Sequence, residues 1–267
     1  MKLIQNNDLK FYKFDIFEGY NIKHCFSTRL GGVSKGCYES LNLAYRQDIP
    51  ENIINNYKII CSANNMDYTS TVWTKQVHTD NILTVTEKDR GRGLIFKGDE
   101  QGCDGLITNC ENVVLTGFSA DCVLIFLYAT DVRAVGIIHS GWRGTVKEIA
   151  RKGVEKICSE FGADSKNIIA GISPAIGKCC FQVDMPVVEE FLRELPWSRE
   201  FILPDKENLQ KRYIDLHGIN ERILLNAGVR AENIENSRIC TRCNSDVFFS
   251  HRAMGSERGS LAGLISL

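Results

Sequence analysis

The chain has 267 residues and a formal charge of −1 at pH 7, with 32 basic and 33 acidic side chains. This length suits one large domain or two small ones, and either can bury a sizeable core. The balanced charge gives no electrostatic reason to expect nucleic acid or a membrane surface as a partner. The longest apolar run, Val123 to Ala129, is far shorter than a membrane span, and the first residues lack the apolar core of a signal peptide.

The 11 cysteines are odd in number and irregularly spaced. A secreted disulfide scaffold is usually smaller and has an even number, so we expect mostly free thiols and a cytoplasmic location. The vicinal pair Cys179-Cys180 is expected to be structural. Cys240 and Cys243 form a C-x-x-C, but no second such pair or paired histidines follow it, so no zinc finger is predicted there.

Predicted strands and helices alternate irregularly along the chain. Helices are predicted from their 3.6-residue apolar periodicity at about 50–64, 145–161, 187–195 and 213–227. Strands are predicted within 8–28 and at 71–78, 81–86, 113–115, 123–128, 133–138, 168–172, 179–183 and 261–267. Without a visible repeat or linker, this order favours one mixed α/β or α+β domain covering residues 1–267.

The stretch from Ala120 to Thr145 has the pattern of a β-hairpin that ends in a reactive site. Two β-rich apolar runs flank a break at Thr130 and Asp131. With a two-residue loop there, Cys122 and His139 are cross-strand partners, with Cβ atoms roughly 5 Å apart. A thiol and an imidazole at that spacing can share a metal ion or a proton. A slip of one residue would put them on opposite faces, so the inference depends on the register.

The segment His139-Ser-Gly-Trp-Arg-Gly144 after the hairpin predicts an anion site. Its glycines allow a close backbone approach. A helix that starts near Thr145 would present free N–H groups to an anion, and the guanidinium of Arg143 suits phosphate or carboxylate. A buried cysteine and a satisfied core histidine are the ordinary alternative for either residue alone. The predicted pairing favours a site.

Eight segments in order resemble one family over nearly the whole chain, the bacterial YfiH/YlmD-type laccase-domain proteins, which are also called multicopper polyphenol oxidase-like or purine nucleoside phosphorylase-like proteins. The matching segments are Arg29-Leu-Gly-Gly-Val-Ser34, Ser40-Leu-Asn-Leu43, Lys75-Gln-Val-His78, Cys103-Asp-Gly-Leu-Ile-Thr108, Ala120-Asp-Cys122, His139-Ser-Gly-Trp-Arg-Gly144, Gly171-Ile-Ser-Pro-Ala-Ile-Gly177 and Phe249-Ser-His-Arg252.

The resemblance implies an α+β fold, a single-domain four-layer α/β/β/α sandwich with mixed sheets that is related to the cytotoxic-necrotizing-factor cysteine hydrolases. It implies zinc ligands at His78, Cys122 and His139. The chain departs from the family at its end, where Glu257-Arg258-Gly259 replaces a common Thr-Gly-Arg. The substrate role of the family's final arginine is therefore an open question here.

Two imidazoles and a thiolate suit Zn²⁺ and leave a fourth position open, as catalytic zinc requires. The resemblance implies a zinc-dependent purine nucleoside enzyme that phosphorolyses adenosine, inosine, guanosine and S-methyl-5′-thioadenosine and deaminates adenosine. Its partners would be purine nucleosides and phosphate. Expected phosphate ligands are Arg29 and Arg143, and expected supporting, base or ribose contacts are Asn42, Gln76, Asp104 and Asp121.

Two other functions remain open. The first is a Cys-His hydrolase with Cys122 as nucleophile and His139 as base, which uses the same pair but leaves His78 without a role. The second is copper oxidation of phenols, since two histidines and a cysteine also suit copper. A multicopper oxidase needs many more histidines than the 5 present, so we rank it last. A binding protein without turnover is the remaining alternative, since family membership does not establish catalysis.

Overall fold

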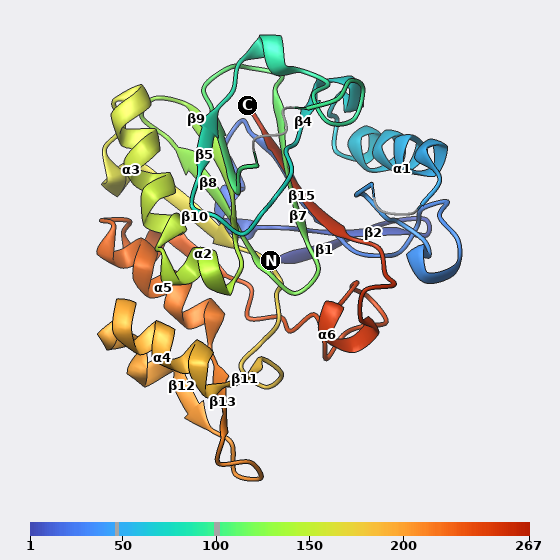
Figure 1. Cartoon of the computed structure of the whole chain (residues 1–267). Coiled ribbons are helices and arrows are strands. Elements are labelled where there is room, and N and C mark those ends of the chain that lie inside the picture. Colours follow the sequence, from blue (N-terminus) through green and yellow to red (C-terminus); the bar gives the residue numbers. More distant parts are fainter. Residues whose placement is uncertain (46–47, 99–101) are drawn as a thin grey trace.

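Two six-stranded sheets form the centre of the molecule (Figure 1). The computed structural model describes residues 1–45, 48–98 and 102–267. The first sheet has the order β1 (Lys2–Asn6), β2 (Leu9–Lys13), β3 (Lys23–Ser27), β15 (Leu261–Ser266), β7 (Val114–Ser119) and β4 (Thr71–Val72). The second has the order β14 (Ile234–Asn236), β10 (Ile168–Ile172), β8 (Val123–Ala129), β9 (Ala134–Ser140), β6 (Gly105–Thr108) and β5 (Ile82–Thr84).

The described residues also form six α-helices and a small third sheet. The helices are α1 (Pro50–Ala63), α2 (Trp142–Val146), α3 (Ile149–Phe161), α4 (Met185–Glu194), α5 (Leu216–Asn226) and α6 (His251–Met254). The third sheet has the order β11 (Gln182–Asp184), β13 (Lys211–Ile214) and β12 (Ile202–Pro204). In the described part of the chain, no helix has both the length and the apolar character needed to cross a membrane.

The strand β8 is buried on both faces, which explains its continuous apolar run. Leu124 and Phe126 belong to the core between the two large sheets, whereas Ile125 and Leu127 belong to the core between the second sheet and the helices. On the far side, Tyr57 of α1 belongs to a third core beneath the first sheet. The layers are therefore helix, sheet, sheet and helix, and the predicted α/β/β/α sandwich is confirmed (Figure 1).

The hairpin register differs from the prediction. The strands end at Ala129 and begin again at Ala134, so the loop is four residues long, and Leu124 lies opposite His139. Cys122 lies just before β8 rather than opposite His139. Because side chains alternate along a strand, Cys122 still continues the face that carries Leu124. The predicted register is wrong by two positions. A shift of two keeps every side chain on the same face of the sheet, so Cys122 and His139 still share one face.

Three other predicted elements differ in extent. The helix expected from Thr145 to Phe161 is two helices, α2 and α3, because Glu148 between them has a left-handed backbone, with φ of 52°. The first part of the helix expected from Tyr213 is strand β13. The strand expected at 71–78 ends at Val72, and the backbone N–H groups of residues 77–79 bind the Asp104 carboxylate instead.

Candidate metal centre

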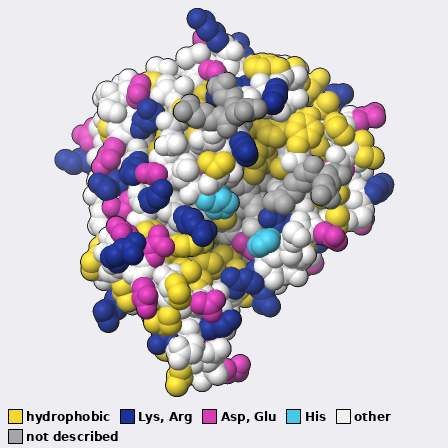
Figure 2. Space-filling model, viewed as in Figure 1, with side chains coloured by type: hydrophobic (Ala, Val, Ile, Leu, Met, Phe, Trp, Pro, Cys, Tyr) yellow, Lys and Arg dark blue, Asp and Glu magenta, His cyan; other side chains and the backbone are white. Residues whose placement is uncertain are grey.

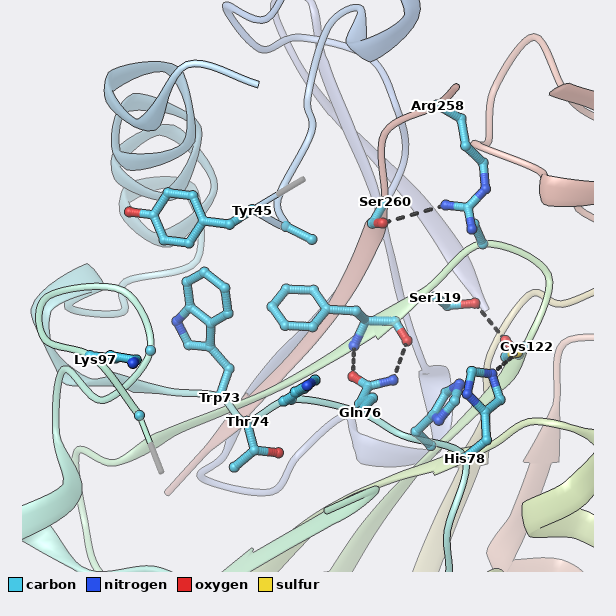
Figure 3. A pocket seen from close by; sticks show the side chains of 17 residues that line it. Tyr45, Trp73, Thr74, Gln76, His78, Lys97, Ser119, Cys122, Arg258 and Ser260 are labelled. Atoms are coloured by element: carbon cyan, nitrogen blue, oxygen red, sulfur yellow. Dashed lines mark hydrogen bonds between the residues drawn. The ribbon is translucent and has the colours of Figure 1, made fainter. Parts of the chain in front are cut away.

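Three potential metal ligands from distant parts of the chain lie together at one end of the second sheet. They are His78, Cys122 and His139, and their ligand atoms all lie within 4.8 Å of one another. We call them the His-Cys-His centre. His78 is exposed, Cys122 is half-buried and His139 is buried, so the group is open to solvent on one side only. Figure 3 shows His78 and Cys122 side by side at the edge of a cavity.

The turn between β7 and β8 presents Cys122. Asp121 in this turn has a positive φ of 92°, and its carboxylate is held from two sides. The hydroxyl of Thr241 donates to Oδ1 at 2.6 Å, and the backbone N–H of Arg252 donates to Oδ2 at 2.7 Å. Asp121, predicted as a possible substrate contact, therefore fixes the backbone that carries the thiol.

Asp104 connects the two histidines. Its Oδ1 lies 2.8 Å from Nδ1 of His139 and accepts the backbone N–H of His78 at 3.0 Å. Its Oδ2 accepts the backbone N–H and the hydroxyl of Thr79. These bonds stabilise the positive φ of 61° at His78. They also leave Nε2 of His139 for a ligand, which is the arrangement that orients metal-binding histidines.

The electrostatics favour a charged thiolate and imidazolium when no metal is bound. Burial would raise the pKa of the Cys122 thiol, but the charge of His139 and hydrogen bonds from both histidines outweigh burial and lower the pKa to about 6. Burial would lower the pKa of His139, but the Cys122 thiolate and Asp104 raise it to about 9. For Asp104, burial opposes the charge, whereas His139 and Thr79 lower its pKa to about 2.

Gly141 closes the back of the centre. A Cβ at this position would lie 3.0 Å from Cδ2 of His78 and 3.1 Å from Sγ of Cys122. Any larger residue would therefore press on two of the three ligands. The absence of a side chain at Gly141 therefore lets the backbone lie directly against these two side chains.

A cavity of about 780 Å³ extends from the centre. Figure 2 shows histidine side chains in a hollowed region of the surface, with hydrophobic and basic side chains around it. Tyr45 stacks on Trp73 with ring centroids 5.3 Å apart, and Phe118 packs edge-on against Trp73 at 4.9 Å. Tyr45 and Trp73 lie on the opposite side of the cavity from His78 and Cys122 (Figure 3). The cavity therefore has an aromatic wall on one side and the His-Cys-His centre on the other.

Two of the predicted contact residues support the cavity wall. Gln76 lines the cavity, and its amide exchanges hydrogen bonds with the backbone of Phe118 at 2.6 and 2.9 Å. Asn42 is fully buried, and its amide bonds Ala44, Asp48 and the N–H of Ser260. The Asn42 amide has no capacity left for a substrate, because protein groups occupy both its donors and its acceptor oxygen.

The two arginines predicted to bind phosphate do not line this cavity. The guanidinium of Arg29 donates to the carbonyls of Glu39 and Ser245 and lies over the ring of Phe249. The guanidinium of Arg143 lies 4.2 Å from the ring centre of Trp142. The helix that follows Gly141 is the short α2, so the long helix expected to face an anion is absent from this position.

Other cations do line the cavity, namely Lys75, Lys97 and Arg258. Arg258 is buried, and its Nη1 donates to the carbonyl of Gly259 at 2.8 Å and lies 3.4 Å from the hydroxyl of Ser260 (Figure 3). It belongs to the segment Glu257-Arg258-Gly259 that departs from the family ending, and it lies in the wall of the cavity. No sequence pattern marked Tyr45, Trp73 or Lys97, because a cavity wall assembled from separate loops has no periodicity.

The donor set fits zinc. Tetrahedral zinc with Zn–S near 2.3 Å and Zn–N near 2.0 Å places sulfur and nitrogen roughly 3.5 Å apart. Sγ of Cys122 and Nε2 of His78 are 4.0 Å apart. A small movement of these two side chains toward each other would reach the separation that a zinc ion requires. A zinc ion held by these three residues, all of which line the cavity, would keep a fourth coordination position open.

Comparisons with known proteins identify the family. Residues 23–267 match the family described as multi-copper polyphenol oxidoreductase laccase. The chain is 34% identical over 244 residues to purine nucleoside phosphorylase YlmD of Bacillus subtilis, covering 91% of this chain and 87% of that protein. It is 32% identical over 254 residues to adenosine deaminase RL5 from an unidentified prokaryote, covering 92% and 95%. The crystal structure of the protein YfiH of Bacillus licheniformis superposes with a TM-score of 0.91 at 32% identity, over 99% of this chain and 98% of that one. The chain therefore belongs to the multi-copper polyphenol oxidoreductase laccase family.

Proposed function

We propose that the protein is a zinc-dependent purine nucleoside enzyme of the cytoplasm. It would phosphorolyse adenosine, inosine, guanosine and S-methyl-5′-thioadenosine and deaminate adenosine. The observation that carries the proposal is the His-Cys-His centre at one side of a cavity whose other side is aromatic. The names of the two relatives, a purine nucleoside phosphorylase and an adenosine deaminase, support the same substrate class.

The aromatic wall suits a purine base. The cavity volume of about 780 Å³ lies within the usual range of roughly 300–1,000 Å³ for small-ligand sites. Tyr45 is 40% exposed and offers a ring to the cavity, and Trp73 holds that ring from behind. A flat heterocycle gains about 1–3 kcal/mol from stacking on such a ring. Base specificity would then depend on polar groups further along the wall.

The basic residues of the wall suit phosphate. Lys75 and Lys97 are exposed at the cavity, and Arg258 is buried in its wall. A guanidinium binds phosphate through paired hydrogen bonds, whereas an ammonium acts as a point charge. We propose these three cations for the phosphate in place of Arg29 and Arg143, because all three line the cavity and the two predicted arginines do not.

The ligands in this proposal are His78, Cys122 and His139. Zinc bound there would supply Lewis acidity next to the substrate. Asp104 would hold the His139 ring so that Nε2 faces the ion, and it would keep the His78 turn closed. Because the imidazole must be neutral to bind a metal, metal binding would displace the proton that His139 otherwise retains up to a pKa of about 9.

An assay with zinc-loaded protein, adenosine and phosphate tests the function. Chromatography should show adenine and ribose 1-phosphate only when phosphate is present. Deamination should give inosine without phosphate, and inosine together with hypoxanthine when phosphate is present. Omitting zinc after chelation should stop both reactions. If neither adenine nor inosine forms with fully loaded protein, the proposal is wrong.

One observation favours a second function, a Cys-His hydrolase. In the metal-free protein the pKa of Cys122 is lowered to about 6, which is typical of a nucleophilic cysteine beside a histidine. This alternative gives His78 no role, although His78 lies 4.0 Å from the thiol. Activity that persists after complete chelation would favour the hydrolase. Copper-dependent phenol oxidation is ranked last because of the 5 histidines.

A further inference from the structure

Four cysteines meet outside the cavity. They are Cys179, Cys180, Cys240 and Cys243, and their sulfurs all lie within 4.8 Å of one another. We call them the four-cysteine cluster. The first two follow β10 and the other two follow β14, in separate loops. Sγ of Cys243 lies 3.5 Å from that of Cys179 and 3.4 Å from that of Cys180. All four cysteines are free thiols.

These distances match a tetrahedral metal site. With Zn–S bonds of 2.3 Å, the sulfurs of a four-thiolate zinc site lie roughly 3.8 Å apart. A disulfide would need two sulfurs about 2.05 Å apart. Its formation would draw two of the four cysteines together and away from the other two. The vicinal pair and the C-x-x-C, which gave no metal site when considered separately, together provide four ligands. Their sequence separation explains why spacing alone did not reveal the cluster.

Two of the four sulfurs, those of Cys240 and Cys180, accept hydrogen bonds from N–H donors. The backbone N–H of Gly177 donates to Sγ of Cys240 at 3.2 Å, and Nη1 of Arg242 donates to Sγ of Cys180 at 3.5 Å. Arg252 donates to the carbonyl of Cys180 at 2.9 Å, so a second cation lies beside the cluster. Such N–H···S bonds and nearby positive charges are the contacts that orient metal-bound thiolates and offset their charge.

The backbone brings the two loops together before any ion binds. The N–H of Ala175 donates to the carbonyl of Ile239, and the N–H of Thr241 donates to the carbonyl of Ala175. Cys240 and Cys180 are buried, whereas Cys179 and Cys243 are exposed and give an ion a route of entry. The site is therefore preorganised and accessible.

We propose that the four-cysteine cluster is a second zinc site, closed and structural, that cross-links the loops after β10 and β14. Four thiolates fill all positions of a tetrahedral zinc ion and leave none for a substrate. Its position gives it a role in the fold. Thr241 lies between Cys240 and Cys243, and its hydroxyl binds the carboxylate of Asp121, the residue before Cys122. The second ion would thus hold the loop that holds the His-Cys-His centre.

Metal content of the full-length protein tests this proposal. Protein purified under reducing conditions and incubated with zinc alone should retain two equivalents after desalting. The double variant His78→Ala/Cys122→Ala should retain one. Adding Cys243→Ser to that variant should remove the remaining equivalent, whereas adding Cys158→Ser, a half-buried cysteine of α3, should not. Cys243 is exposed, so its replacement by serine leaves the apolar core intact.

Cobalt substitution gives an independent measurement. In the His78→Ala/Cys122→Ala background, cobalt should give the intense thiolate charge-transfer and visible bands of a tetrahedral four-sulfur site. Cys243→Ser should weaken them. The proposal is overturned if the double variant holds no zinc or cobalt. It is also overturned if peptide mass spectrometry of the protein, purified without reductant, finds a disulfide within the cluster and reduction does not create metal binding.

Discussion

The His-Cys-His centre and the four-cysteine cluster differ in ligand number and in what surrounds them. The first offers one ligand from the loop before β5, one from the turn before β8 and one from β9, and it faces a cavity of about 780 Å³. The second offers four ligands from two loops and faces protein and solvent. A carboxylate, Asp104, supports the first, and a cation, Arg242, supports the second. Open coordination suits chemistry, and complete coordination suits cross-linking.

Charge makes the same distinction. With zinc, two neutral imidazoles and one thiolate carry one net positive charge, which favours an anionic co-substrate. Four thiolates with zinc carry two net negative charges, which require neighbouring cations. Arg242 and Arg252 lie beside the four-cysteine cluster, whereas Asp104 lies beside the His-Cys-His centre. Each site therefore has neighbours of the opposite sign to its own net charge.

The largest effect is expected from Cys122→Ala. Loss of the thiolate should remove tight zinc binding from the His-Cys-His centre and lower turnover about 10³-fold or more, because several kcal/mol of transition-state stabilisation depend on the ion. Elemental analysis should show one equivalent lost and one retained. Cys158→Ala serves as the matched control and should keep both the metal and the activity. Full zinc content in Cys122→Ala would refute the ligand assignment.

Asp104→Asn should have the next largest effect. The amide cannot both accept from His139 and keep all the N–H bonds of the His78 turn, so zinc affinity or activity should fall about 10- to 100-fold. Competition with a chromophoric chelator measures this affinity. Asp80→Asn is the matched control, because Asp80 lies two residues after His78 but pairs with Lys147 and Lys152. The four-cysteine cluster should keep its ion in both variants. Equal loss of zinc from the two sites would contradict the view that Asp104 supports only the His-Cys-His centre.

A smaller effect is expected from the arginines that face each site. Arg258→Gln should raise the phosphate KM about tenfold, since one charge-assisted bond is worth about 1.5–3 kcal/mol. Arg143→Gln, which removes a guanidinium stacked on Trp142 outside the cavity, should change that KM less than about twofold. Arg242→Gln should leave the phosphate KM alone and speed zinc loss from the four-cysteine cluster. A larger KM effect at Arg143 than at Arg258 would restore the phosphate site expected from the sequence.

Local patterns predicted most of the fold. Pro50 and the apolar spacing after it fixed the start and the face of α1, and the run from Val123 to Ala129 marked the central strand. The missed elements are short ones such as β12 and β14, whose three residues each carry too little periodicity. The strand expected to reach His78 ends earlier, because the carboxylate of Asp104, which is distant in sequence, binds the backbone at His78.

The three ligands of the candidate centre could be proposed from the sequence, whereas their surroundings could not. The hairpin placed Cys122 and His139 near each other even with the wrong register, since a shift of two preserves the face. Asp104 was expected only as one of several supporting residues, because its five bonds form only when three loops meet. The four-cysteine cluster required the same tertiary information, because its halves lie far apart in the chain.

Cysteine alkylation gives the finest comparison of the two sites. Zinc-bound thiolates react more slowly than free ones, so iodoacetamide should label neither Cys122 nor the exposed Cys179 and Cys243 in fully loaded protein. Cys37, which is exposed and distant from both sites in sequence, should label in every state and serves as the internal control. Peptide mass spectrometry is needed to assign each modification.

Under increasing chelator, Cys122 should label first, because the three-ligand site loses its ion before the four-ligand site. In the stripped protein the pKa of Cys122 is about 6, so its labelling should rise roughly tenfold between pH 5 and pH 7 and then level off. Activity should disappear with the first ion. A Cys-His hydrolase requires the opposite behaviour, since the metal-free protein would turn over substrate and alkylation of Cys122 would stop it. If the extent of labelling of Cys179 and Cys243 does not change with chelator concentration, no ion occupies the four-cysteine cluster.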